Sequence, residues 1–440
     1  MKKSLYASIA AITLTATGAA AEGTVTVITS FPDSMTGPIE AAFEAAHPAY
    51  DLEILNKSTS SGVKFIQETA GSNTSDIFWA SAPDAFEVLK SNGLLASVSP
   101  KASGIPAKIG AYPMNDTDGT YFGFAAAGYG IMWNERYLKA NGLAPAKEWG
   151  DLAKAEYHGH VGMSAPSRSG TTHLTVETLL QGDGWDDGWS KWKWIAGNFN
   201  TVTERSFGVP DGVNTGNFGL GVVIDFFGFS SKASGFPVDF AYPTVTALVP
   251  ANVAVVKNAP NHEGAVTFIE YLLSPEGQEV LFDPAIMRLP INPATYAKAP
   301  EGFPNPFEDS SIGAAVKFDV EKSGARYNLV NSLFDVMITY RLDDLRDAVR
   351  AVQLAEAKHG NGDNAEAKAL IAEARALINA NPIDEAKSMD PEFAAIFTKK
   401  RKKATDEVGA RQAEIEQQWD AMVVQNYARA KELAEKAASL

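Results

Sequence analysis

Apolar residues in the first quarter of the chain recur with two alternating spacings. Short β-branched runs at 24–30 (TVTVITS), 51–57 (DLEILNK) and 76–83 (DIFWASAP) predict strands, and a helical spacing follows each run, as in 37–48 (GPIEAAFEAAHP). Strands that alternate with helices predict a parallel sheet covered on both faces. Because ligands of such sheets bind beyond the carboxyl ends of the strands, we look for a site at those ends.

The middle of the chain continues the pattern with longer extended segments. Two glycine-rich apolar pieces occupy 120–134, and 240–257 (FAYPTVTALVPANVAVVK) is a long extended stretch. We interpret these as crossing strands, with hinges near 122–130 and 240–250. Residues 262–282 predict a pair of helices, because Ser-Pro inside that segment is a helix start signal.

The pattern changes near residue 310. From there the chain is rich in Ala, Glu, Lys, Arg and Leu at helical spacing. This spacing predicts an all-helical extension over 310–440 whose helices have antiparallel neighbours.

The N-terminus and the composition restrict the compartment and the partners. Residues 1–21 combine Lys2 and Lys3, a short apolar run and a final Ala-Ala-Ala, which is typical of a cleaved secretory signal peptide. We therefore expect a periplasmic protein. A net charge of −15 argues against nucleic acid as a partner. It does not exclude a small anion, since charges in water are screened beyond ~8 Å.

One helix start carries more polar groups than a cap requires. In 164–180 (SAPSRSGTTHLTVETLL), hydroxyl residues, Gly170 and Arg168 precede an apolar helical pattern. The first turn of a helix has four unpaired N–H groups and about half a positive charge, which together favour an anion. The alternative is an ordinary N-cap in a surface loop.

The sequence lacks the common signatures of catalysis. Neither Gly-x-Ser-x-Gly nor His-Glu-x-x-His nor a Walker loop occurs in it. We therefore expect a binding protein rather than an enzyme.

Four segments in order resemble a known family: 75–96 (SDIFWASAPDAFEVLKSNGLLA), 128–138 (GYGIMWNERYL), 164–171 (SAPSRSGT) and 262–293, which contains SPEGQEVL and ends in LPINP. They are similar to the periplasmic substrate-binding proteins of bacterial ABC importers, in the branch around ferric-ion-binding proteins.

The resemblance implies a type II α/β fold with two lobes. Lobe 1 would contain 22–121 and 250–309, and lobe 2 would contain 122–249. It also implies an inner-membrane ABC permease as the partner, and we expect a monomer.

The resemblance also bears on the ligand. Ferric-binding members coordinate iron with a tandem tyrosine pair, where this chain has Phe226 and Phe227. Phenylalanine offers no oxygen to a hard cation, so we expect neither a metal nor another cofactor. Other members of the branch bind sugar phosphates or phosphoglycerate, which implies a small phosphorylated solute here. A protein of the same fold for ferric ion or another anion, and a ligand sensor for a membrane receptor, remain the alternatives.

The candidate ligand contacts lie at predicted strand ends and helix starts. They are Ser30, Ser34, Thr36, Thr59, Ser60, Ser81, Arg168, Ser169, Gly170, Thr171, Thr172, Ser206, Asp225 and Thr244.

Overall fold

A computed structural model describes residues 23–109, 112–309, 312, 316–359, 362–397 and 407–440. The predicted signal peptide, 1–21, lies outside the described residues. Among the residues described, no helix is both long enough and apolar enough to cross a membrane.

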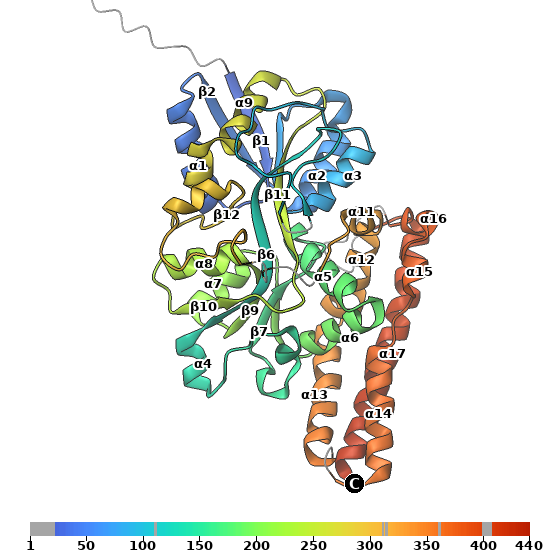
Figure 1. Ribbon diagram of the computed structural model, residues 1–440. Coiled ribbons are helices and arrows are strands. Elements are labelled where there is room, and N and C mark those ends of the chain that lie inside the picture. Colours follow the sequence, from blue (N-terminus) through green and yellow to red (C-terminus); the bar gives the residue numbers. More distant parts are fainter. Residues whose placement is uncertain (1–22, 110–111, 310–311, 313–315, 360–361, 398–406) are drawn as a thin grey trace, which may run out of the picture.

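One mixed sheet runs through the body of the molecule (Figure 1). Its strand order is β2-β1-β3-β11-β6-β9-β7-β8, and β10 and β12 also pair with β6. The strand bounds are β1 Gly23–Thr29, β2 Tyr50–Asn56, β3 Ile77–Ala80, β6 Phe122–Asn134, β7 Val161–Ser164, β8 Phe199–Thr203, β9 Leu220–Ile224, β10 Val238–Ala241, β11 Leu248–Val255 and β12 Leu289–Pro290. Outside this sheet, β4 (Lys108–Ile109) pairs with β5 (Tyr112–Pro113).

The predicted parallel arrangement is present at both ends of the sheet. β1 pairs in parallel with β2 and β3, and β7 pairs in parallel with β8 and β9. Between these groups, β6 and β11 run antiparallel to each other and to their outer neighbours. We call the half containing β1–β3 lobe 1 and the half containing β7–β9 lobe 2.

The crossing strands differ in one detail from the sequence prediction. Every residue of β6 and of β11 is buried, which explains their continuous apolar character. The extended stretch predicted at 240–257 is divided into β10 and β11 by residues 242–247, which pair in neither strand.

Helices follow the strands and cover both faces of the sheet. Their bounds in lobe 1 are α1 Asp33–Ala46, α2 Thr59–Thr69, α3 Pro83–Ser91, α9 His262–Leu273 and α10 Pro275–Val280. In lobe 2 they are α4 Glu135–Asn141, α5 Gly170–Gly182, α6 Trp185–Ala196, α7 Gly208–Thr215 and α8 Asp225–Ala233. The predicted Ser-Pro start is confirmed, because the Ser274 hydroxyl caps α10 by accepting from Gly277 N at 3.1 Å.

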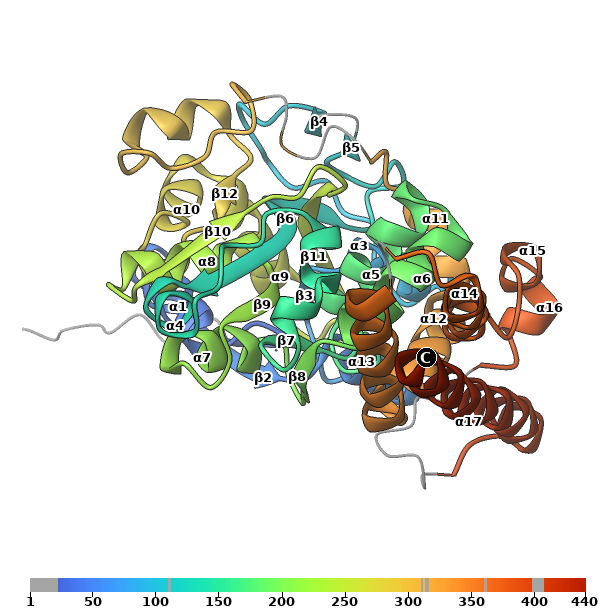
Figure 2. The same cartoon turned by 90° about the horizontal axis from the view of Figure 1, so that it is seen from below.

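The helical character predicted for 310–440 is confirmed over its described residues. The bounds are α11 Val320–Ala325, α12 Tyr327–Phe334, α13 Leu342–His359, α14 Ala365–Asn379, α15 Glu385–Ser388, α16 Pro391–Ala394 and α17 Ala410–Ser439. A π-helical segment, Asp335–Thr339, joins α12 to α13. The long helices α13, α14 and α17 contact one another and form a bundle beside the α/β body, as Figure 2 shows from below.

The bundle covers the tryptophan-rich helix α6. Trp185 Nε1 donates to Ile383 O at 3.0 Å, and Trp194 Nε1 donates to Asn379 Oδ1 at 2.8 Å. The structure buries all four tryptophans of α6, and the extension lies over this helix and accepts from the indole N–H groups of Trp185 and Trp194.

Candidate functional site

A small cavity lies where five strand-to-helix connections from the two lobes meet. Among the described residues, six hydroxyl side chains, two guanidinium groups and no carboxylate line it, together with three phenylalanines and one proline. The lining residues are Ser30, Phe31, Pro32, Ser58, Thr59, Arg168, Ser169, Thr171, Arg205, Ser206, Phe226 and Phe227. A lining of donors without an acid favours an anion, although the chain as a whole is acidic.

The N-terminus of α5 is capped by a serine side chain. Ser169 Oγ accepts from Thr172 N at 3.2 Å, and both residues are almost fully buried. Arg168 Nη1 lies 3.3 Å from Thr203 O and 3.3 Å from Glu204 Oε1. Because the Glu204 side chain is 84% exposed, this ion pair contributes little and leaves Arg168 able to bind another anion.

Other helix starts face the same cavity. Ser58 caps α2 by accepting from Ser61 N at 3.3 Å, and Thr59 begins that helix. The starts of α1, at Pro32, and of α8, at Phe226, also line the cavity. Helix N-termini carry partial positive charge, so several of them around one point add to the field of the two arginines.

The cleft between the lobes is closed around this cavity, whose volume of about 10 Å³ is the room of roughly one water molecule. Ser60 Oγ donates across the cleft to Ser167 O at 3.0 Å, and Arg205 Nη2 donates to Asn56 Oδ1 at 3.0 Å. A Cβ on Gly170 would lie 2.7 Å from Ala82 Cβ, so glycine permits this approach. Gly170 is one of the predicted ligand contacts, and in the structure its close neighbours, Ala82 and Thr59, are in lobe 1.

A buried arginine lies behind the cavity wall. Arg288 is fully buried, and its guanidinium lies 4.9 Å from the Phe31 ring and 4.6 Å from the Phe226 ring, both of which line the cavity. It has no carboxylate within 4.0 Å among the described residues, and its Nε has no hydrogen-bond partner there. Burial lowers the pKa of the guanidinium to about 10, so it stays charged at neutral pH. An unpaired buried cation strengthens the preference for an anion nearby.

Asp225 does not line the cavity, and both of its carboxylate oxygens accept hydrogen bonds from within the protein. Its Oδ2 accepts from Gly128 N at 2.7 Å and from the Tyr242 hydroxyl at 2.8 Å, and Oδ1 accepts from Phe226 N at 2.7 Å. Burial raises the pKa of this carboxyl to about 6. The hydrogen bonds and the charge of Arg288 act in the opposite direction and lower this pKa, but burial has the larger effect. Asp225 therefore fixes the start of α8 against β6 in this state.

The structure brings together six of the fourteen predicted contacts: Ser30, Thr59, Arg168, Ser169, Thr171 and Ser206. Ser60 and Gly170 lie at the contact between the lobes rather than in the cavity wall. Ser81 accepts from Arg288 Nη2 at 2.9 Å. Thr36 and Thr172 are buried, and Ser34 is exposed on α1.

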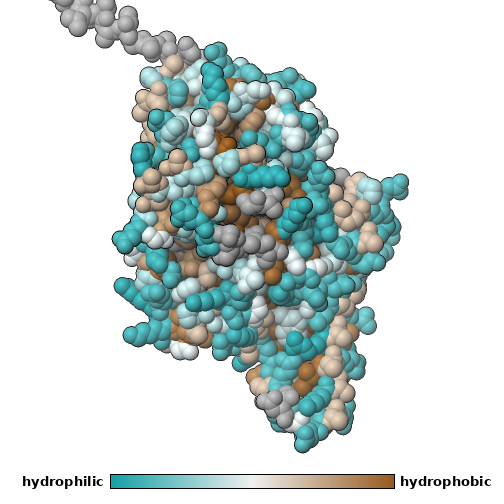
Figure 3. Space-filling model, viewed as in Figure 1, coloured by the Kyte–Doolittle hydropathy of each residue, from teal (hydrophilic) through white to brown (hydrophobic). Residues whose placement is uncertain are grey.

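Thr244 lies at a different cavity of about 1140 Å³, between α8, β10 and residues 300–309 and 312. Its hydroxyl donates to Glu148 Oε1 at 2.7 Å. Figure 3 shows that hydrophobic residues on the visible face gather near its middle, while hydrophilic residues cover most of the rest.

Sequence reasoning missed Arg288. It follows Met287 in the segment that links α10 to β12, far in sequence from the other site residues. Its only signal was a single charged residue inside the apolar run AIMRLPI, which is unusual for a buried segment.

Over the described residues, no group of three or more His, Asp or Glu side chains is placed to hold a metal ion. Phe226 and Phe227 line the cavity and offer it no oxygen.

Both curated proteins and solved structures are similar to this chain. The phosphoglycerate transport regulatory protein PgtC of Salmonella typhimurium is 32% identical over 375 residues, which cover 84% of this chain and 89% of that protein. Iron uptake protein A1 of Synechocystis is 27% identical over 197 residues, 41% of this chain and 54% of that protein.

The periplasmic binding protein AfuA of Actinobacillus pleuropneumoniae, solved with fructose-6-phosphate bound, has a TM-score of 0.64 at 21% identity and covers 71% of this chain and 98% of its own. The apo ferric ion-binding protein A of Pasteurella haemolytica has a TM-score of 0.56 at 16% identity, covering 71% and 96%. These likenesses confirm the predicted two-lobed type II fold. The model of bacterial extracellular solute-binding proteins matches residues 72–307. The chain therefore belongs to the bacterial extracellular solute-binding protein family.

Proposed function

We propose that this protein captures a phosphorylated small organic anion, of the sugar phosphate or phosphoglycerate type, between its lobes and delivers it to an inner-membrane ABC permease. The observation that carries the proposal is the lining of the inter-lobe cavity, where the part of the chain that the structure describes offers two guanidinium groups, six hydroxyls and no carboxylate. The proposed lobes are 22–121 with 250–309 and 122–249, and the proposed location is the periplasm.

The ligand class rests on charge and on a relative. A phosphate dianion takes several N–H and O–H donors and bidentate arginine contacts, which this cavity supplies from Arg168, Arg205 and the hydroxyl groups. PgtC is named for the regulation of phosphoglycerate transport, and AfuA shows that this fold can hold a phosphate ester. A cavity of about 10 Å³ is far smaller than any such ligand. The lobes must therefore open to admit the ligand and then close less tightly than they do here.

Iron is the weaker candidate. Fe³⁺ prefers oxygen ligands that carry negative charge, and the described residues of the cavity wall include no carboxylate. The two arginines would repel a bare cation. A ferric complex with an anionic carrier, such as ferric citrate, would not be repelled in this way.

In this proposal the protein binds its solute and does not catalyse a reaction. Asp84, His173 and Ser323 are residue types of a hydrolase triad and they lie together, but all three are fully buried. Ser323 Oγ donates to Asp84 Oδ2 at 2.8 Å, so the hydroxyl is not held as a nucleophile for the histidine.

A membrane receptor is the alternative partner to a permease. PgtC is named as a regulatory protein, and this chain carries a helical extension beyond the matched family region. Pull-down of membrane proteins with the purified protein distinguishes the two alternatives, because the captured proteins would be either the subunits of an ABC permease or a receptor.

Titration calorimetry of the purified protein tests the ligand. We expect 3-phosphoglycerate or a sugar phosphate to bind, and Arg205→Gln to weaken that binding by at least about tenfold, since a charge-assisted hydrogen bond contributes roughly 1.5–3 kcal/mol. Arg136→Gln is the matched control, because Arg136 is exposed on α4 and remote from the cavity lining. Binding of ferric citrate with no binding of any phosphate ester would overturn the proposal.

A further inference from the structure

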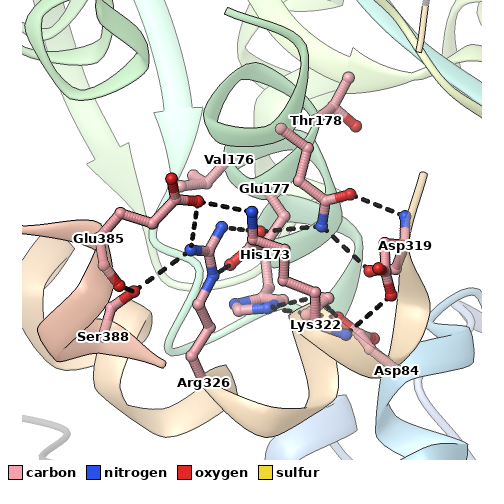
Figure 4. Close-up of polar contacts among 12 residues, drawn as sticks. Asp84, His173, Val176, Glu177, Thr178, Asp319, Lys322, Arg326, Glu385 and Ser388 are labelled. Carbon is pink, nitrogen blue, oxygen red and sulfur yellow. Dashed lines mark hydrogen bonds and ion pairs between the residues drawn. The ribbon is translucent and has the colours of Figure 1, made fainter. Parts of the chain in front are cut away.

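The helical extension meets both lobes at one buried point. Asp84 on α3 belongs to lobe 1, His173 on α5 to lobe 2 and Ser323 on α11 to the extension, and we call these three residues the junction. His173 Nε2 lies 3.3 Å from Asp84 Oδ2 and 3.1 Å from Ser323 Oγ, and Ser323 Oγ donates to Asp84 Oδ2 at 2.8 Å. Figure 4 shows Asp84 and His173 near Lys322 and Arg326 of the extension. Each junction residue is 0% exposed, so none has water as an alternative partner.

The extension is held firmly to lobe 2. Arg326 binds Glu177 of α5 through two hydrogen bonds, Nε to Oε1 at 2.9 Å and Nη2 to Oε2 at 2.8 Å, and both side chains are fully buried (Figure 4). Asn331 Oδ1 lies 2.8 Å from His173 Nδ1. Together with the contacts to α6, these bonds attach the extension to lobe 2.

The contact with lobe 1 is narrower. Helix α11 packs against α3, and a Cβ on Gly324 would lie 3.3 Å from Glu87 Cβ, so the two helices approach closely. The hydrogen bond from the Ser323 hydroxyl to Asp84 is a buried polar contact between these helices. This contact, unlike those to lobe 2, crosses between parts of the chain that a hinge motion would separate.

The junction is next to the cleft. Ser169 lines the cavity, and His173 lies one helical turn further along α5. When the lobes open, Asp84 moves away from His173. Ser323 on α11 and Asn331 on α12 are eight positions apart, so keeping Ser323 on Asp84 and Asn331 on His173 would then require these two helices to move apart at Arg326.

We infer that α11 is a latch that docks on lobe 1 through Ser323 and Asp84 only when the lobes are closed. Docking stabilises the closed form, because opening leaves a carboxylate without two of its buried partners. The inference rests on the proposed function for the ligand that closes the cleft. By linkage, a contact that favours the closed state raises ligand affinity, and ligand in turn favours the docked latch.

The latch gives the extension a role in reporting occupancy. Helix α12 continues through the segment Asp335–Thr339 into α13, which contacts α14 and α17. The position of this bundle relative to lobe 1 would therefore depend on whether the cleft is closed, which gives a partner a surface that differs between the two states.

The distance between the lobes tests the latch directly. The chain has no cysteine, so Gln67→Cys in lobe 1 and Lys139→Cys in lobe 2, both exposed positions, allow specific spin labelling. Ser323→Ala is the latch variant. Ser332→Ala is its matched control. This substitution removes the same atom, a serine hydroxyl oxygen, but the Ser332 hydroxyl donates to Glu416 within the extension at 2.7 Å.

We expect Ser323→Ala to shift the distance distribution of the unliganded protein toward longer distances and to weaken 3-phosphoglycerate binding by about tenfold. Ser332→Ala should change neither. The latch is refuted if folded Ser323→Ala and wild type share one distance distribution with and without 3-phosphoglycerate. If no phosphate ester binds but the unliganded distributions differ, the latch stands and the proposed ligand fails. If the ester binds equally to both proteins, the latch fails and the ligand stands.

Discussion

Two buried ionisable side chains, Asp225 and Arg288, lie behind the cleft without reaching ion-pair distance of each other. Each keeps hydrogen-bond partners, Gly128 and Tyr242 for the acid and Ser81 for the arginine. Burial raises the pKa of the Asp225 carboxyl and lowers that of the Arg288 guanidinium, so burial disfavours both charges. The buried charge of Arg288 is therefore incompletely compensated, and an anion beside it would stabilise that charge.

The raised pKa of Asp225 predicts a pH-dependent stability. Its folded value of about 6 lies above the unfolded value of roughly 4, so the folded protein holds this proton more tightly. This contribution is fully present below about pH 4 and is lost as the pH rises through 6. The unfolding free energy of wild type, relative to Asp225→Asn, should therefore fall by roughly 3 kcal/mol between about pH 4 and about pH 7. Denaturant unfolding at several pH values measures this, and a constant difference would contradict it.

At the scale of elements, the start of α5 combines a structural and a binding role. Ser169 is the N-cap, and Thr171 lines the cavity beside it. A cap uses one hydroxyl to pair one N–H, so the remaining donors of the first turn stay available to a ligand.

The double variant Ser169→Ala with Thr171→Val separates these roles. We expect phosphate-ester binding to weaken by at least tenfold, about 1.4 kcal/mol, and the unfolding free energy to fall by about 1 kcal/mol through loss of the cap. Asn364→Ala is the control, since Asn364 caps α14 by accepting from Ala367 N at 3.0 Å, far from the cavity. Calorimetry and denaturant unfolding report the two effects, and unchanged affinity would reduce the motif to a cap.

At the scale of the molecule, closure depends on how closely the lobes approach. Lobe 1 reaches α5 at Gly170, where a Cβ would meet Ala82 Cβ at 2.7 Å and Thr59 Cγ2 at 2.8 Å. Contacts this short force a shift, and separating the lobes slightly is the least costly one because they are joined by two crossing strands.

Gly170→Ala should therefore hold the lobes further apart. We expect a longer inter-lobe distance in the unliganded protein, with little loss of stability because alanine favours the first turn of a helix. Gly37→Ala in α1 is the matched control, since a Cβ there meets nothing within 4 Å. Small-angle scattering compares the two variants, and equal radii of gyration would show that the closed contact tolerates the methyl group.

Several features of the site followed from local patterns in the sequence. The hydroxyl-rich start at 167–172 was recognised because capping and anion binding both use the residues of one helical turn, which are adjacent in sequence. Thr244, a predicted contact inside the extended stretch at 240–257, instead donates to Glu148 and lines the larger cavity. Arg288 went unnoticed because its partners, Phe31 and Phe226, are more than sixty residues away along the chain.

The sequence by itself determined the alternation of strands and helices, the start of α5, the helical extension and the family resemblance, because periodicity, capping and composition are properties of neighbouring residues. Only the tertiary structure decided that Arg205 and Arg168 converge on one cavity, that the α6 tryptophans lie beneath the extension and that Asp84, His173 and Ser323 meet. These contacts join segments far apart along the chain. Which segments meet is set by burial of their shared apolar surfaces, and no local pattern encodes that pairing.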